Sequence, residues 1–254
     1  MLLSADDPPA FELVRRTGRS PYLLTADHAG RAVPRRLGDL GVPGAAMATH
    51  IASDLGIAEL ARGVSERLDA WLILQSYSRL LIDANRPPGS PQSIVTLSER
   101  TRVPGNERLS APDAEARERE ILQPYHDCIR DELEQRAATN QPIALCSLHS
   151  FTPTFMGITR PWHIGVLFNR DARLARVVLQ LLRQDRSLTV GENEPYSVSD
   201  ETDYTVVVHG ERRGIPHVEI EIRQDLIATE TGQASWSDRL AGVLRNAYAA
   251  IDPT

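Results

Sequence analysis

Short apolar runs of strand length alternate along this chain with amphipathic helical patterns, and this alternation restricts the fold more than any other feature. Candidate strands lie at Tyr22–Ala26, Trp71–Leu74, Arg79–Asp83, Ile143–Leu148, His163–Phe168, Thr205–Val208 and Val218–Ile222. Apolar residues at three-four spacing predict helices over 57–68, 174–182 and 240–251. Because strands that alternate with helices build a largely parallel or mixed sheet covered on both sides, the sequence predicts an α/β fold with a mixed central β-sheet and helices on both faces.

The domain organisation follows from length and from the turn-rich segments. A chain of 254 residues has room for one large α/β domain or two small ones. Turn-rich stretches around Pro87–Pro91 and Arg102–Pro112 are predicted to be long loops, because hydrophobic patterns resume on both sides without a low-complexity linker. We therefore expect a single domain over residues 1–254.

Composition excludes several classes of partner. A formal charge of -6 argues against a general nucleic-acid binder, which needs a basic face to neutralise phosphates. No apolar run approaches the roughly 20 residues that span a bilayer. The first residues carry acids and prolines where a secretory signal has a basic and then an apolar stretch. We expect a cytoplasmic protein that binds neither nucleic acid nor membrane.

The basic and sulfur-containing residues exclude further chemistries. All 28 basic residues are arginine, so phosphate-loop lysines, Schiff-base nucleophiles and lysine general bases are absent. The two cysteines, Cys128 and Cys146, form no CxxC pair and no disulfide framework, which is typical of a reducing compartment.

Polar residues follow the apolar runs at the positions where strands of such a sheet deliver ligand-binding groups. In open α/β sheets, ligands bind beyond the carboxyl ends of the strands. Here the runs end in Asp27-His28-Ala29-Gly30, Ala84-Asn85-Arg86-Pro87, His149-Ser150-Phe151 and Asn169-Arg170-Asp171. This edge of the sheet is where we look for chemistry.

Two of these residues are histidines, the side chains that catalytic zinc most often binds. Catalytic zinc sites use three protein ligands and leave a position for water. His28 and His149 are the candidate imidazole ligands, and Asp54, which opens the helical pattern at Ile57, is the candidate carboxylate. Taken singly, each has a simpler interpretation: Asp54 as a helix N-cap, and each histidine as an ordinary hydrogen-bonded side chain. Convergence of all three at one edge favours a metal site.

A hydrolytic metal site also needs a base. The polar residues of one late strand share a single face because strand side chains alternate with a period of two. These residues are His217, Glu219 and Glu221. A solvated edge strand would explain the same pattern. Since Glu221 lies nearest the strand end, we predict it to be the general base.

Arginines beside the predicted strand ends suggest a substrate with carboxylates, because a guanidinium pairs with a carboxylate through two parallel hydrogen bonds. The candidates are Arg79, Arg86, Arg160, Arg170 and Arg223. Any one of them alone is better interpreted as a surface ion-pair partner. Arg86, between Asn85 and Pro87, is the preferred candidate.

Six segments together resemble the N-formylglutamate amidohydrolases. They are DHAGRAVP (27–34), SRLLIDANRP (78–87), SLHSFTP (147–153), IGVLFNRD (164–171), GENEPYS (191–197) and PHVEIEIRQDLI (216–227). The match keeps its order from about Tyr22 to Ile227. That family resembles the zinc carboxypeptidases and the zinc N-acetylmuramoyl-alanine amidases in fold, the phosphorylase/hydrolase-like mixed sheet between helices.

The resemblance implies that His28 and His149 bind zinc and that Glu221 activates water. In the amidase relatives the carboxylate ligand opens the helix after the first metal histidine, which corresponds to Asp54. In the carboxypeptidase relatives it lies three residues after that histidine, where this chain has Arg31, which cannot bind a metal. Residues in the matched segments that the resemblance implies for the substrate carboxylates are Asn85, Arg86, Arg160, Asn193 and Tyr196.

The resulting hypothesis is a zinc-dependent hydrolase of the amide bond of a small N-acyl amino acid, with N-formyl-L-glutamate as the leading substrate. Thr25-Ala26-Asp27 stands where many relatives carry serine and proline, so other N-acyl amino acids are alternative substrates. Two alternatives belong to other classes. One is a serine or cysteine hydrolase using Ser147 or Cys146, although alternation puts Cys146 in the core. The other is a non-catalytic protein that binds dicarboxylates.

Overall fold

A seven-stranded mixed sheet forms the centre of the protein in the computed structural model, which describes residues 1–251. Its strands, in spatial order, are β1 (Phe11–Val14), β3 (Trp71–Gln75), β2 (Tyr22–Ala26), β6 (Ala144–Phe151), β11 (His217–Arg223), β9 (Ile164–Leu167) and β10 (Val190–Glu192). The four central strands β3, β2, β6 and β11 run parallel. β1 and β9 are antiparallel to their neighbours β3 and β11.

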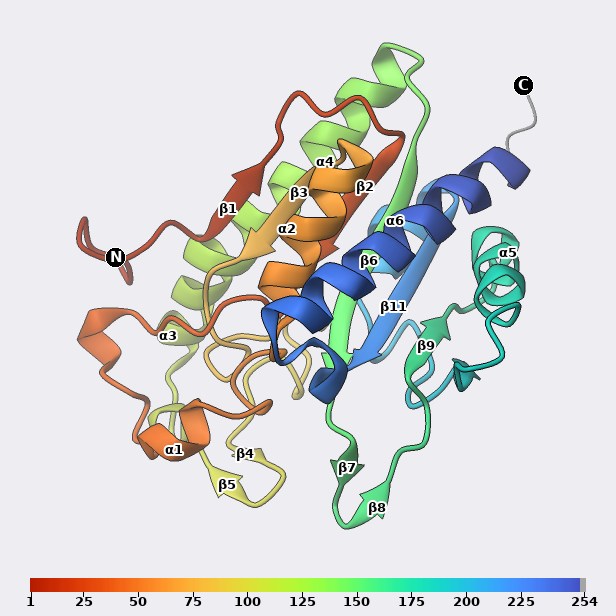
Figure 1. Cartoon of the computed structure of the whole chain (residues 1–254). Coiled ribbons are helices and arrows are strands. Elements are labelled where there is room, and N and C mark those ends of the chain that lie inside the picture. The colour runs from red at the N-terminus through yellow and green to blue at the C-terminus, as the bar shows by residue number, and fades with distance from the viewer. Residues whose placement is uncertain (252–254) are drawn as a thin grey trace.

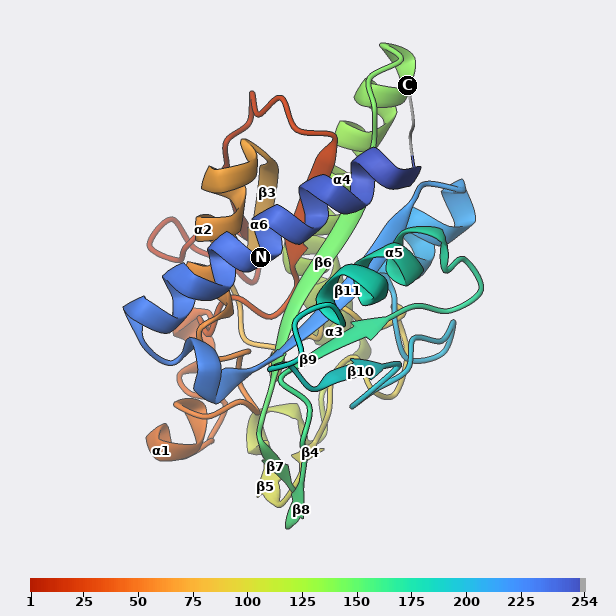
Figure 2. The ribbon, with the colours of Figure 1, turned by 45° about the vertical axis from the view of Figure 1, so that its right-hand side comes forward.

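Helices cover both faces of this sheet (Figures 1 and 2). On one face lie α2 (Ile57–Leu68), α5 (Arg173–Leu182) and α6 (Glu230–Ile251), whose apolar residues share one buried cluster with alternate residues of the strands. On the other lie α3 (Ala111–Arg117) and α4 (Gln123–Ala138). The predicted mixed α/β architecture is confirmed. No helix within residues 1–251 combines the length and the apolar character needed to cross a bilayer.

Shorter elements complete the chain. They are α1 (Gly44–Met47), 3₁₀ turns at Arg35–Leu37, Pro104–Asn106, Glu211–Arg213 and Gln224–Ile227, and π-helical turns at Glu118–Leu122 and Val206–Gly210. Two hairpins, β4–β5 (Leu97–Ser98, Thr101–Arg102) and β7–β8 (Thr154–Phe155, Ile158–Thr159), project from the end toward which β6 and β11 point (Figures 1 and 2). The predicted loop at Arg102–Pro112 is shorter than expected, because Ser110 caps α3 by accepting the Asp113 N–H at 3.3 Å.

The period of two in β6 and β11 divides apolar from polar side chains. Cys146 and Leu148 join the buried cluster with α2, α5 and α6. Ser147 and His149 point to the opposite face, and the parallel register sets Glu219 beside Ser147 and Glu221 beside His149. All of these side chains are buried. β11 is an interior strand, so the solvated-edge interpretation of its acids is wrong.

Two predicted strands do not form. Arg79–Asp83 lies in a turn-rich loop, and its apolar residues Leu80, Leu81 and Ile82 are buried against the core on the α4 side. Thr205–Val208 belongs to a helical turn instead of a strand. Burial explains both errors, because tertiary contacts make a loop or a helical turn as apolar and β-branched as a strand.

Candidate active site

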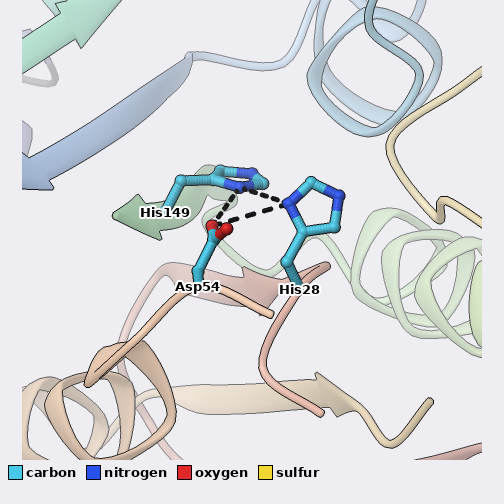
Figure 3. A group of neighbouring side chains, drawn as sticks. All are labelled: His28, Asp54 and His149. Carbon is cyan, nitrogen blue, oxygen red and sulfur yellow. Dashed lines mark hydrogen bonds and ion pairs between the residues drawn. The ribbon is translucent and has the colours of Figure 1, made fainter. Parts of the chain in front are cut away.

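Three side chains from distant parts of the chain converge where β2 and β6 end (Figure 3). His28 follows β2, His149 lies near the end of β6, and Asp54 lies in the loop before α2. The Nδ1 atoms of the two histidines are 3.2 Å apart. Asp54 Oδ2 lies 3.1 Å from Nδ1 of His149 and 3.5 Å from Nδ1 of His28. All three residues are buried, and their donor atoms lie within 4.8 Å of one another.

Asp54 faces the histidines and does not cap α2. The helix begins after Gly56, whose φ of +79° suits glycine, and a Cβ there would lie 2.4 Å from the Ile227 carbonyl oxygen. The Asp54 N–H donates to the His28 carbonyl at 2.9 Å, and the Ser150 N–H donates to Asp54 Oδ2 at 3.2 Å. The N-cap interpretation of Asp54 is therefore wrong.

The remaining nitrogen of each histidine lies against a carboxylate. Nε2 of His28 is 2.7 Å from Asp83 Oδ1, and Nε2 of His149 is 3.2 Å from Asp27 Oδ2. Asp27 is itself held by the hydroxyls of Tyr125 and Thr205, which donate to its Oδ1 at 2.7 and 2.9 Å. A carboxylate partner for Nε2 favours the proton on that nitrogen and leaves Nδ1 with a lone pair, the form that binds a metal.

Charge in this cluster favours a cation. Arg79 bridges Asp83 (2.8 Å) and Asp54 (3.4 Å). Burial by itself would raise the pKa of Asp83, but the charges of Arg79 and His28 hold it well below its ordinary value. Burial likewise opposes ionisation of Asp54, yet the charges and hydrogen bonds of His28 and His149 lower its pKa. Both carboxylates are thus anionic beside the paired imidazoles.

His28, Asp54 and His149 line a cavity of about 420 Å³, within the range typical of small-molecule sites. Its lining comprises His28, Asp54, Arg79, Asn85, Arg86, His149, Ser150, Tyr196, Ser197, Thr202, Asp203, Glu219 and Glu221. A larger cavity of about 650 Å³ lies between the N-terminal residues and α3, but no histidine is among its described lining residues.

Two acids of β11 line the cavity, and they differ in how they are bonded. Burial raises the pKa of both Glu219 and Glu221 to about 8, against the opposing charge of His149. Glu219 Oε2 accepts a long hydrogen bond, 3.5 Å, from the Asn85 amide. Glu221 Oε2 is buried and has no hydrogen-bond partner within residues 1–251. Glu221 therefore has a buried acceptor atom that no hydrogen bond occupies.

The structure brings four of the five predicted substrate residues to this region. Asn85, Arg86 and Tyr196 line the cavity, and Arg160 donates to the Tyr196 hydroxyl at 2.9 Å. Asn193 does not line it. Its Oδ1 accepts the N–H of Phe168 at 2.9 Å, so its side chain serves the backbone at the end of β9.

Both ends of the Asn85 amide are already engaged. Its Oδ1 accepts the N–H groups of Tyr204 and Thr205, each at 3.0 Å, and its Nδ2 donates to Asp203 at 3.3 Å. Asn85 therefore holds residues 203–205, which lead into the helical turn at Val206–Gly210, against the site.

Two other candidate arginines form ion pairs with nearby acidic side chains, as surface arginines commonly do. Arg170 pairs with Asp200 and Glu211, and Arg223 pairs with Asp225. The simpler ion-pair interpretation applies to these two residues.

The candidate nucleophiles of a serine or cysteine hydrolase are inaccessible. Cys146 lies fully buried among the core residues shared with α2, α5 and α6, and burial raises the pKa of its thiol. Ser147 is also fully buried, and its hydroxyl contacts Asp27 and the Nε2 of His149, the nitrogen turned away from Asp54. Neither side chain lines the cavity.

Several site residues were not among the sequence-based candidates: Asp27, Asp83, Ser150 and Asp203. A signal existed for three of them, because Asp27 directly precedes His28, Ser150 directly follows His149, and Asp83 ends the apolar run before Asn85. Nothing local distinguishes Asp203 from the neighbouring acids Asp200 and Glu201.

Comparison with known proteins gives the following matches. The family model described as N-formylglutamate amidohydrolase matches residues 20–228. The crystal structure of a gene product of Agrobacterium tumefaciens superimposes with a TM-score of 0.95 at 33% identity, covering 99% of each chain. An N-formylglutamate amidohydrolase from Ralstonia eutropha superimposes with a TM-score of 0.67 at 18% identity, covering 94% of this chain and 97% of that one, and this likeness shows the fold. Among curated proteins, none matches this chain.

Proposed function

Because this chain belongs to the N-formylglutamate amidohydrolase family, we propose that it is a zinc-dependent hydrolase of the amide bond of N-acyl amino acids. N-Formyl-L-glutamate, which would give L-glutamate and formate, is the reference substrate, because the description of the family names it. The observation that carries the proposal is the convergence of His28, Asp54 and His149 on one cavity, with an acid of β11 beside them.

The residues present fit a zinc ion. Two imidazoles and one carboxylate are a donor set of catalytic zinc sites, which keep a further position open. The Nδ1 atoms of the two rings lie 3.2 Å apart, each ring has its Nε2 against a carboxylate, and a bound cation would stabilise this arrangement. When bound, zinc supplies a Lewis acid and lowers the pKa of a water molecule.

Glu221 supplies the proton transfer. Its unpartnered Oε2 accepts the proton of the attacking water. The water oxygen bonds to the acyl carbon, the carbon–nitrogen bond breaks, and the proton held on Glu221 passes to the leaving nitrogen. Burial beside Asp54 raises the pKa of Glu221, which makes its carboxylate a stronger base than an exposed glutamate.

The arginines would hold the substrate carboxylates and so place the acyl carbon. Arg86 lines the cavity, with its Nη1 donating to the carbonyl oxygens of Asn85 and Thr202. Arg160 lies over the rings of Phe155 and Tyr196 at 4.6 and 4.8 Å. Within residues 1–251 neither guanidinium forms an ion pair with a carboxylate, which leaves both available to a substrate anion.

Chelation and one substitution test the proposal. Treatment with a chelator should abolish hydrolysis of N-formyl-L-glutamate, and added zinc should restore it. Glu221→Gln should lower kcat by about 100- to 10,000-fold while the protein keeps its zinc, because glutamine is a close steric match that cannot accept the proton. Near wild-type turnover of zinc-loaded Glu221→Gln would show that the base is wrongly assigned. A protein that purifies without zinc and binds dicarboxylates without hydrolysis would instead support the non-catalytic alternative.

A further inference from the structure

A second cavity of about 310 Å³ adjoins the cavity of the metal-binding residues. We call the first the inner cavity and the second the outer chamber. Arg79, Arg86 and Tyr196 line both. The other residues of the outer chamber are His50, Ile51, Leu80, Asp83, Gln92, Val95, Leu97, Ser98, Glu99 and Phe155. The inner cavity and the outer chamber therefore meet at these three side chains.

The inner cavity is large enough for a small N-acyl amino acid. At about 420 Å³ it already has the volume of an ordinary small-molecule site, roughly 300–1,000 Å³. A substrate as short as N-formylalanine would leave the outer chamber empty. The outer chamber is thus surplus space for the reaction itself, and its wall chemistry indicates what fills it.

Apolar side chains make up much of that wall. Ile51 and Leu80 are buried, Val95 is half-buried, and Leu97 and Phe155 come from the two hairpins. The large hydrophobic residues exposed within residues 1–251, apart from Met1, are Leu97, Phe155, Met156, Ile158 and Tyr196. Four of these lie on or between the hairpin strands at the end toward which β6 and β11 point (Figures 1 and 2). Of the exposed hydrophobic residues, Leu97, Phe155 and Tyr196 line the outer chamber, and exposed apolar side chains gathered at a cavity are typical of a binding site.

The charged residues of the outer chamber are mostly satisfied by one another. Arg79 pairs with Asp83 at 2.8 Å, and His50 lies 2.6 Å from Glu99. Arg86 is the exception, since its hydrogen-bond partners within residues 1–251 are two backbone carbonyl oxygens. A second charged group of a substrate would compete with these existing pairs, whereas an apolar group would cover exposed carbon.

The order of groups along the two cavities therefore matches one kind of molecule. The metal-binding residues and Glu221 come first, the unpaired guanidinium of Arg86 lies at the junction, and the apolar wall follows. We propose that the outer chamber is a subsite for a large apolar amino-acid side chain, so that N-acyl derivatives of aromatic and large aliphatic amino acids are better substrates than N-formyl-L-glutamate. This inference rests on the proposed amidohydrolase function.

The test compares kcat/KM of the zinc-loaded protein for N-formyl derivatives of L-phenylalanine, L-leucine, L-glutamate and L-alanine. We expect kcat/KM for the phenylalanine and leucine derivatives to exceed kcat/KM for the alanine and glutamate derivatives by roughly tenfold or more, because a large apolar side chain gains binding energy in a matching pocket. Leu97→Ser should lower kcat/KM for N-formyl-L-phenylalanine several-fold. It should leave kcat/KM for N-formyl-L-alanine unchanged, because the alanine side chain is too short to reach the outer chamber. Ile158→Ser is the matched control. Ile158 is also an exposed hairpin residue, with 71% of its surface accessible to solvent, but it does not line the outer chamber.

The outcomes separate this proposal from the proposed function. Hydrolysis of all four substrates at equal efficiency, or a preference for glutamate, would overturn the subsite and leave the hydrolase intact. Equal effects of Leu97→Ser and Ile158→Ser on every substrate would also overturn it. Hydrolysis of none of the four by zinc-loaded protein would overturn the proposed function and the subsite together.

Discussion

The protein buries two pairs of histidines whose ring nitrogens are almost equally close, yet only one pair is suited to a metal. In the site pair, Nδ1 of His28 lies 3.2 Å from Nδ1 of His149. In the second pair, between α4 and the helical turn at Val206–Gly210, Nδ1 of His126 lies 3.1 Å from Nε2 of His209. All four rings are buried.

The difference lies in what surrounds each pair. Asp54, Asp83 and Asp27 contact the site pair. Burial by itself would lower the pKa of His149, but the charge of Glu219 and the hydrogen bonds of Asp27 and Asp54 raise it.

The second pair lacks such partners. His126 contacts the Ala84 carbonyl at 2.8 Å, and His209 Nδ1 has no hydrogen-bond partner within residues 1–251. Burial, reinforced by the charge of His126, lowers the pKa of His209 to about 3. Burial and proximity of histidines do not make a cation site, and the surrounding carboxylates decide it.

The largest expected difference between the two histidine pairs is in their effect on zinc binding. His149→Ala should weaken zinc binding by more than about 100-fold, since it removes one of the three proposed ligands outright, whereas loss of a supporting carboxylate costs about 10- to 100-fold. His209→Gln should retain stoichiometric zinc. Metal analysis after dialysis, with circular dichroism to establish folding, measures both. Equal zinc content in the two variants would contradict the conclusion that only the His28–His149 pair is suited to a metal.

A smaller effect should follow from removing one supporting charge. Asp83→Asn leaves an acceptor for Nε2 of His28 but removes the negative charge, so zinc affinity should fall by about 10- to 100-fold. Competition with a chromogenic chelator gives the affinity. Glu99→Gln is the control, because Glu99 contacts the partly exposed His50 at 2.6 Å and forms no ion pair with His28, Asp54 or His149. The hypothesis fails if both substitutions change the affinity equally.

The smallest expected effect concerns stability and pH at the second pair. Native His209 stays neutral to about pH 3, whereas an unfolded histidine binds a proton near its ordinary pKa of 6.5. The unfolded state therefore binds more protons between these values, and stability falls as pH falls through this window.

From pH 7 to 5.5, the His209 contribution to this loss should be about 1 kcal/mol. Urea unfolding of wild type and His209→Gln at the two pH values isolates it. Wild type should lose about 1 kcal/mol more than the variant, and an equal loss would show that His209 does not stay neutral when buried.

The helices that cover the sheet show how much of the fold local patterns predict. α2 and α5 present single apolar stripes to the core, so their spacing alone locates them. α4 buries Tyr125, His126, Ile129, Leu133 and Arg136. Because its buried face contains a histidine and an arginine, no apolar stripe indicates the helix. Its polar buried residues are paired with groups far away in the chain, such as His209 for His126.

For the site, the sequence itself determined which residue types stand at the strand ends and which face of each strand they share. Period-two alternation separates Ser147 and His149 from Cys146 and Leu148 without knowledge of the fold, because it is a property of the extended backbone. The same alternation places Glu219 and Glu221 on one face.

Only the tertiary structure decided which of these groups meet. Asp27 and Asp83 support the histidines, Arg79 links two carboxylates, and Asn193 turns to the backbone of Phe168. Electrostatic and hydrogen-bond energies depend on distances of a few ångströms. Residues about 120 positions apart, such as His28 and His149, reach those distances only when the sheet has assembled.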